Sequence, residues 1–268
     1  MKKYVLDLTV RSVQRVSEKH VLIKLTTSPR QGDTACQPLP DMLPGQFVEV
    51  RVDGSSSTFL RRPISINFVD RENNELWLLV AMIGEGTRRL GRLVAGDTLN
   101  CVLPLGNSFT MPSTNSPRGS YLLVGGGVGM APMLYLGAQM RQRGIEPTFL
   151  LGGRTATDIL QLDLFRQYGR VCITTEDGSL GERGFVTNHS VLHEHFDRIY
   201  TCGPKPMMVA VARYAVPLGI ECEASLENMM ACGLGACLCC VEKVKDDGNV
   251  CVCKEGPVFN VKRLLWQI

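Results

Sequence analysis

Cysteines crowd one segment of this chain, which has 268 residues and 11 cysteines. Seven of the cysteines lie within residues 222–253. Among them, Cys232, Cys237 and Cys240 form the spacing C-x4-C-x2-C, and further cysteines follow. This spacing followed by a remote cysteine is typical of the ligands of a plant-type 2Fe-2S cluster. An odd total crowded into one segment does not fit the disulfide framework of a small secreted protein.

Zinc is the main alternative for these thiolates, because four cysteines also form a structural zinc site. Zinc ribbons usually have two short C-x2-C knuckles, whereas three candidate ligands here fall in one loop, so the spacing favours the iron cluster. Gly233 and Gly235 in that loop leave room for backbone amide groups to approach the sulfur atoms of a cluster.

The fourth ligand is expected from a hairpin that follows the loop. VEKV and NVCVC alternate like strands, and the turn KDDGN (245–249) between them returns the chain to Cys240. Cys251 and Cys253 are two residues apart and would share one face of a strand, so periodicity does not choose between them. Cys239 is adjacent to Cys240 and is expected to point the opposite way.

One glycine-rich segment suits the binding of a dinucleotide. GGGVGMAP (125–132) follows a predicted strand and opens a helix, so Gly126, Gly127 and Gly129 are candidate cofactor contacts. The segment departs from the G-x-G-x-x-G fingerprint at its third glycine. Arg154, rather than an acidic residue, follows the next strand, which leaves the choice between NAD and NADP open.

A second turn is expected at the same end of the sheet. TCGPKPM (201–207) places Cys202 and Gly203 at the end of another predicted strand, and a helix begins at Pro204. Taken alone, the segment fits an ordinary strand-to-helix turn equally well. Together with the glycine-rich segment, it predicts that Cys202 and Gly203 contact the same cofactor.

Two further segments suit a phosphate and a ring system. RRPIS (61–65) places Arg62 three residues before Ser65, so that an arginine could neutralise a phosphate while a hydroxyl group contacts a ring. Gly86 and Thr87 lead into a short predicted helix, whose first amide groups suit a pyrophosphate. Each signal is weak by itself, because surface arginines and helix starts are common.

Two scaffolds are predicted to position these residues. Up to about residue 108, short β-rich runs separated by turn residues indicate a small antiparallel barrel with one brief helix. Its predicted strands are residues 21–26, 46–52, 63–68, 76–81 and 97–104. Residues 110–120 contain two prolines and five hydroxyl residues and are predicted to form a linker.

Beyond the linker, strands alternate with helices, which indicates a doubly wound parallel sheet. The predicted strands are residues 121–124, 147–151, 171–175, 198–202 and 219–225. Ligands of such sheets bind beyond the carboxyl ends of the strands, which is where the glycine-rich segments fall. The C-terminal residues that hold the cysteines fit neither pattern.

The composition excludes several other classes of protein. Hydrophobic residues make up 44% and charged residues 21% of the chain, as in ordinary globular proteins. A net charge of +3 is too small to indicate binding to nucleic acid or an anionic membrane. Asp7 and Arg11 interrupt the apolar run that a signal peptide needs, so a cytoplasmic location is expected. Glycines and a proline interrupt the uncharged stretch 120–140, which argues against a membrane span.

Together these segments resemble the ferredoxin reductase type of flavoprotein, and within it the electron transfer subunits of NAD-dependent dihydroorotate dehydrogenases. RRPIS, GEGT, GGGVGMAPM, TCGPKPMM, SLENMMACGLGACLCCV and CKEGPVF occur in the order typical of that family, over essentially the whole chain. The resemblance implies three domains. They are an FAD-binding barrel at 1–109, an NAD-binding α/β domain at 118–220 and a small 2Fe-2S domain at 221–268.

The resemblance also implies site residues. The FAD contacts carry over to Arg62, Pro63, Ile64, Ser65, Leu79, Val80, Ala81, Gly86 and Thr87. The cluster ligands carry over to Cys232, Cys237, Cys240 and Cys253. Cys253 is included because it precedes the sequence GPVF (256–259), and Cys251 then has no ligand role. Ile64 departs from the wider reductase family, which usually has an aromatic residue there.

The activity implied by the resemblance is electron transfer in pyrimidine biosynthesis. Electrons would pass between NAD, FAD, the 2Fe-2S cluster and the FMN of a separate catalytic subunit, where dihydroorotate and orotate interconvert. A heterotetramer with two copies of each chain is expected, without nucleic acid or membrane partners. Nothing in this chain supplies an obvious base for dihydroorotate oxidation, so the chain alone is not expected to catalyse it.

Two alternatives remain from the sequence. One is a subunit of a ferredoxin-dependent NADP reductase or sulfide dehydrogenase, against which the segments ACGLGAC and CKEGPVF count. The other is a zinc-stabilised nucleotide-binding regulator without enzymatic activity.

Overall fold

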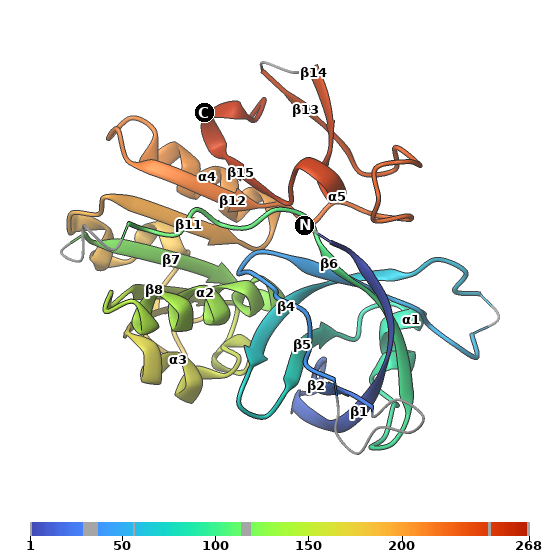
Figure 1. Cartoon of the computed structure of the whole chain (residues 1–268). Coiled ribbons are helices and arrows are strands. Elements are labelled where there is room, and N and C mark those ends of the chain that lie inside the picture. Colours follow the sequence, from blue (N-terminus) through green and yellow to red (C-terminus); the bar gives the residue numbers. More distant parts are fainter. Residues whose placement is uncertain (1, 29–36, 56, 114–118, 246–247, 267–268) are drawn as a thin grey trace.

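The computed structural model describes residues 2–28, 37–55, 57–113, 119–245 and 248–266. They form a β-barrel, a sheet covered by helices and a small C-terminal unit (Figure 1). Both scaffolds predicted from the sequence are confirmed. Residues 114–118 of the predicted linker and 246–247 of the predicted turn lie outside the described residues.

Six antiparallel strands close the barrel in the order β1-β2-β5-β4-β3-β6. They are β1 (Tyr4–Ser17), β2 (His20–Thr27), β3 (Phe47–Val50), β4 (Arg62–Asp70), β5 (Glu75–Ala81) and β6 (Thr98–Leu105). Alternate side chains point inward and form one apolar core, which includes Ile23, Val48, Ile66 and Leu78. The predicted short helix is α1 (Glu85–Leu90), which follows β5.

The longest strand of the barrel, β1, was not predicted from the sequence. It runs over 14 residues and pairs with both β2 and β6. Only Leu8 and Val10 of this strand are buried, while the rest of its side chains are half-buried or exposed. The strand therefore lacks the clear apolar alternation on which prediction depends.

The sheet has seven strands in the order β10-β9-β8-β7-β11-β12-β15. They are β7 (Tyr121–Gly126), β8 (Thr148–Gly153), β9 (Arg170–Thr175), β10 (Glu182–Arg183), β11 (Arg198–Cys202), β12 (Glu221–Ser225) and β15 (Val258–Asn260). All neighbouring strands are parallel except β12 and β15. β10 and β15 were not predicted, because two or three residues are too few to give a periodic signal.

Helices cover both faces of this sheet, as the doubly wound class requires. α2 (Met130–Gln142) and α3 (Leu162–Tyr168) lie on one face, and α4 (Lys205–Ala215) lies on the other (Figure 1). Leu123 of β7 packs in the same core as α2, whereas its neighbours Leu122 and Val124 pack in the same core as α4. Among the described residues, no helix is long and apolar enough to cross a membrane.

The barrel packs directly against helix α2 of the sheet. The side-chain amide of Asn67 in β4 donates to the carbonyl group of Ala131 (3.1 Å). Asn67 and Gln161 also exchange two hydrogen bonds of 3.0 Å. The hydroxyl group of Tyr135 donates to the carbonyl group of Met42 (3.0 Å). These buried contacts fix the position of the barrel relative to the carboxyl ends of the sheet strands.

The C-terminal unit contains a hairpin of β13 (Val241–Val244) and β14 (Gly248–Cys251), followed by α5 (Val252–Glu255). The predicted strand NVCVC is therefore wrong in its second half, because the chain turns into α5 at Val252. Cys253 lies in this helical turn, so it does not share a strand face with Cys251. Val244, Val250 and Val252 join the core beneath α4, which anchors the unit to the sheet.

Candidate functional site

The loop that carries three of the predicted ligands directs backbone amide groups at sulfur atoms. The amide group of Leu234 donates to Sγ of Cys232 (3.3 Å), and that of Gly235 donates to Sγ of Cys253 (3.1 Å). The amide group of Cys253 donates to Sγ of Cys240 (3.3 Å). Amide donors of this kind stabilise thiolates and tune iron–sulfur centres.

The four predicted ligands lie in two pairs. The side chain of Cys237 hydrogen-bonds to Cys232, and amide donation led by Leu234 lowers the pKa of Cys232 to about 6. The side chain of Cys240 hydrogen-bonds to Cys253, whose pKa is raised to about 12, mainly by burial. Two pairs of cysteine sulfur atoms suit a two-iron cluster, whose four cysteine ligands lose their protons when they bind iron. In the described part of the chain, no group of three His, Cys, Asp or Glu side chains has the geometry to hold a metal ion.

Cys239 and Cys251, which lie beside the predicted ligands, have different surroundings from them. Cys239 is exposed whereas Cys240 is buried, in keeping with the prediction that they point in opposite directions. The thiol of Cys251 donates to the carbonyl group of Gly235 (3.8 Å), and within the described part of the chain no backbone amide group donates to its sulfur atom. Cys251 therefore lies beside the loop without sharing the amide environment of Cys232, Cys240 and Cys253.

Arg62 and the first turn of α1 lie together, as the phosphate interpretation requires. A Cβ atom added to Gly86 would lie 3.1 Å from Nε of Arg62 and 2.9 Å from Cγ2 of Thr58. The glycine therefore allows the arginine to approach the start of the helix. The hydroxyl group of Thr87 caps this helix by accepting from the amide group of Gly84 (3.0 Å). The helix begins at Glu85, one residue earlier than predicted.

The other predicted FAD residues lie on the adjacent strands β4 and β5 and differ in what they can offer. Ile64 and Val80 pack in the barrel core, and Leu79 packs in the core of the sheet beside Phe109 and α2. These three residues can offer a cofactor mainly their backbone groups. Pro63, Ser65 and Ala81 are half-buried, so their side chains are partly accessible.

The predicted dinucleotide residues meet at the carboxyl ends of β7 and β11. A cavity of about 1290 Å³ opens there, and its walls include Gly126, Gly127 and residues 152–158. Residues 16–20 at the turn between β1 and β2 form its opposite wall. The cavity thus lies between the barrel and the sheet, where doubly wound proteins bind nucleotides.

Gly129 and Gly203 allow the two turns to pack against each other. A Cβ atom on Gly129 would lie 2.5 Å from the carbonyl carbon and oxygen atoms of Cys202. Gly203 has a φ of +151°, and a Cβ atom there would lie 2.9 Å from the carbonyl oxygen of Gly126. Neither Cys202 nor Gly203 is among the described residues that line the cavity. Their position supports the glycine turn from behind.

Cys202 has a neighbour that the sequence did not reveal. Its thiol is fully buried and donates to Oε1 of Glu227 at 3.9 Å. Burial raises the pKa of Cys202 well above the ordinary thiol value. Glu227 belongs to SLENMM, just before the cysteine loop, where spacing and periodicity give no signal for it.

The cysteine loop is seated on the barrel. Gly233 has a φ of +65°, and a Cβ atom there would lie 2.7 Å from Cγ of Glu49 in β3 and 2.9 Å from Cδ1 of Leu105 in β6. β3 pairs with β4, and Val50 lies opposite Arg62. The loop therefore contacts β3 and β6, and β3 is the neighbour of β4, which carries Arg62.

Comparisons with known proteins agree with this arrangement. Residues 123–213 match the family described as oxidoreductase NAD-binding domain, and residues 227–265 match the iron-sulfur cluster binding domain of dihydroorotate dehydrogenase B. The chain is similar to two proteins called "Dihydroorotate dehydrogenase B (NAD(+)), electron transfer subunit". It is 38% identical to that of Fusobacterium nucleatum over 81% of this chain and 84% of the relative. It is 41% identical to that of Listeria monocytogenes over 81% and 85%.

A solved structure supports the same fold. The structure of an NADH-dependent reduced ferredoxin-NADP oxidoreductase aligns with 99% of this chain and 92% of its own chain, with a TM-score of 0.82 and 26% identity.

Proposed function

Because this chain belongs to the family of electron transfer subunits of dihydroorotate dehydrogenase B, we propose that its three sites form one electron path. The path runs from the cavity between barrel and sheet, along β4 and α1 of the barrel, to the cysteine loop. The observation that carries this proposal is the seating of the loop on β3 and β6, next to the strand that holds Arg62.

The chain's own residues hold the cofactors along this path. Arg62 and the first amide groups of α1 neutralise the pyrophosphate of FAD, since Gly86 lets them meet. Pro63, Ser65 and the strand β5 flank the flavin. Gly126 and Gly127 leave room for NAD in the cavity, and residues 16–20 line it from the barrel side. Gly129 supports this turn by letting Cys202 and Gly203 pack closely behind it.

The cluster is held by two pairs of thiolates. Cys232 and Cys237 would form one pair of ligands and Cys240 and Cys253 the other, in keeping with their hydrogen-bonded pairing. When bound, FAD supplies both the two-electron exchange with NAD and the one-electron exchange with the cluster. Amide groups from the loop and α5 hold the sulfur atoms in place and stabilise their negative charge.

The name of the relatives implies a catalytic partner subunit. We infer that this partner carries FMN, interconverts dihydroorotate and orotate, and docks over the cysteine loop. Three large apolar side chains around the loop support this docking face, because Met229, Leu234 and Leu238 are 82%, 49% and 64% exposed. A heterotetramer with two copies of each chain, in the cytoplasm, remains the prediction from the sequence.

One alternative activity is favoured by a specific observation. The ferredoxin-NADP oxidoreductase structure covers almost the whole chain, which fits a subunit of a ferredoxin-dependent NADP reductase. Its 26% identity is lower than the 38% and 41% shared with the dihydroorotate dehydrogenase relatives. The alternative differs in its partner, which would reduce or oxidise ferredoxin instead of dihydroorotate.

Purification of the chain with its native partners separates these possibilities. We expect recovery of an FMN-containing chain that oxidises dihydroorotate, together with FAD and a 2Fe-2S cluster in this chain. Recovery of a different partner that exchanges electrons with ferredoxin would overturn the proposal in favour of the alternative. Zinc without iron or flavin would overturn both.

A further inference from the structure

Glu49, in the middle of β3, carries a buried carboxyl group that has no hydrogen-bond partner in the described part of the chain. Its side chain is fully buried, and neither carboxylate oxygen has a hydrogen-bond partner among the described residues. Burial of an uncompensated carboxylate is costly, so such groups are rare unless they serve a function. None of the roles described so far uses Glu49.

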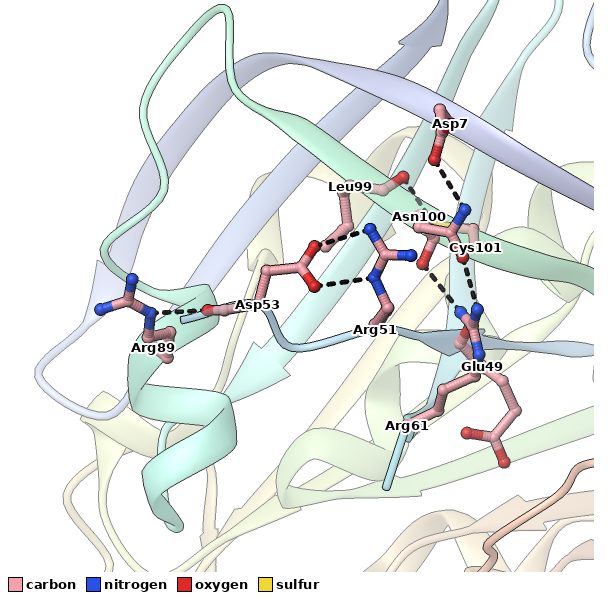
Figure 2. Close-up of polar contacts among 9 residues, drawn as sticks. All are labelled: Asp7, Glu49, Arg51, Asp53, Arg61, Arg89, Leu99, Asn100 and Cys101. Carbon is pink, nitrogen blue, oxygen red and sulfur yellow. Dashed lines mark hydrogen bonds and ion pairs between the residues drawn. The ribbon is translucent and has the colours of Figure 1, made fainter. Parts of the chain in front are cut away.

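The carboxyl group faces the cysteine loop. A Cβ atom on Gly233 would lie 3.3 Å from Oε1 of Glu49, so the carboxylate is close to the backbone beside Cys232. Figure 2 shows that it points away from the polar network on the barrel. Arg61 belongs to that network and donates to the main-chain carbonyl groups of Glu49 (3.2 Å) and Asn100 (3.1 Å). No dashed contact reaches the carboxylate of Glu49.

Charged groups act on Glu49 from two sides. Arg61 and Arg62, at the start of β4, favour the ionised carboxylate, whereas Cys232, in the loop, disfavours it. Burial is the largest effect and raises the pKa of Glu49 to about 7. The carboxyl group thus stands between the arginine proposed to hold FAD and the loop proposed to hold the cluster.

We propose that Glu49 sets the reduction potential of the 2Fe-2S cluster by placing a negative charge behind the cysteine loop. Reduction adds one electron to the cluster, and a nearby carboxylate in a medium of low dielectric disfavours that electron. Glu49 therefore acts on the cluster through its charge and does not bind it. It shifts the one-electron equilibrium so that the electron favours FAD over the cluster. This inference rests on the proposed cluster site.

The test compares four variants of the complete complex, purified with its partner. Glu49→Gln removes the charge and keeps the shape, whereas Glu49→Leu removes the charge and the unpartnered polar atoms. Glu49→Asp retains the charge. Glu75→Gln is the control, because Glu75 is a buried carboxylate of the same barrel that pairs with Arg11 (3.3 Å) and Lys24 (3.7 Å).

The readout is the midpoint potential of the cluster, from its EPR signal during a redox titration at pH 9. Both neutral variants should raise the potential by at least the equivalent of a tenfold change in the equilibrium, which is about 59 mV for one electron. Glu49→Asp and Glu75→Gln should keep the wild-type value.

Two results would overturn the inference. One is an unchanged potential in both neutral variants with an intact cluster signal. The other is loss of the cluster from both neutral variants while Glu49→Asp retains it, since Glu49 would then hold the loop and not tune its potential. Absence of the 2Fe-2S signal from the wild-type chain is a separate result, which would refute the cluster site itself.

Discussion

The cysteines of the C-terminal unit differ in the hydrogen bonds that their sulfur atoms make. Cys232, Cys240 and Cys253 each accept a backbone amide hydrogen bond, whereas Cys251 donates its thiol to a carbonyl group. The C-x4-C-x2-C spacing was enough to predict three ligands. It could not predict the fourth, because the strand turns into α5 at Val252, and strand periodicity does not apply beyond that point.

Replacing single cysteines tests the ligand set. Cys240→Ser should lose the iron and the EPR signal of the cluster, because a hydroxyl group is a poor substitute for a thiolate ligand. Cys251→Ser should retain both, because the Cys251 thiol only contacts the carbonyl group of Gly235. Iron analysis and EPR of the purified variants measure this, and the reverse pattern would show that the fourth ligand is misassigned.

Glu49 should make the stability of the fold depend on pH. Its pKa is raised from 4.5 to about 7 on folding, mainly by burial. The folded state therefore binds more protons than the unfolded state between these two pH values. The contribution of protonated Glu49 to the free energy of unfolding is fully present below pH 4.5 and is lost as the pH rises through 7. The full loss is on the order of 3 kcal/mol.

Melting temperatures from pH 5 to pH 9 measure this loss. The wild-type protein should lose stability relative to Glu49→Leu as the pH rises, since leucine cannot ionise. A constant difference between the two proteins over this range would contradict the buried, unpartnered state of the carboxyl group.

Strands and helices were predictable where their apolar pattern was strong. Five barrel strands and five sheet strands were located from the sequence, whereas β1 has few buried residues and β10 and β15 are too short for a pattern. The contact between Gly233, β3 and β6 could not be predicted, because it joins segments that are far apart in the sequence. Glu49 was missed for the same reason, since its burial depends on the loop above it.

The seating of the cysteine loop depends on Gly233. Gly233→Ala should displace the loop from the barrel, because a Cβ atom would overlap with the side chains of Glu49 and Leu105. Gly248→Ala is the matched control, since Gly248 also has a positive φ of 72° but has no atom within 4 Å of the added Cβ. Both variants carry the backbone cost, on the order of 1 kcal/mol.

Electron exchange between FAD and the cluster measures the effect of the displacement. In Gly233→Ala it should slow by more than tenfold after rapid mixing with NADH, whereas in Gly248→Ala it should stay close to the wild-type rate. Equal rates in the two variants would mean that the seating of the loop does not govern the exchange.

The whole molecule joins three sites whose residues come from distant parts of the sequence. The barrel supplies Arg62 and one wall of the cavity, the sheet supplies the glycine turns, and the loop between β12 and β13 supplies three cysteines. The sequence patterns predicted each group of residues separately. The resemblance to a known family implied that the three groups act together in electron transfer. Their relative placement follows from tertiary contacts such as Asn67 with Ala131 and Gln161.

This chain should exchange electrons with NAD by itself but depend on a partner subunit for dihydroorotate. Anaerobic rapid mixing of the purified chain, loaded with FAD and the cluster, tests it directly by absorbance. NADH should bleach the flavin and cluster absorbance of the isolated chain. Dihydroorotate should bleach it only after the catalytic subunit is added. Reduction of the isolated chain by dihydroorotate, at the rate of the complex, would contradict its dependence on the catalytic subunit.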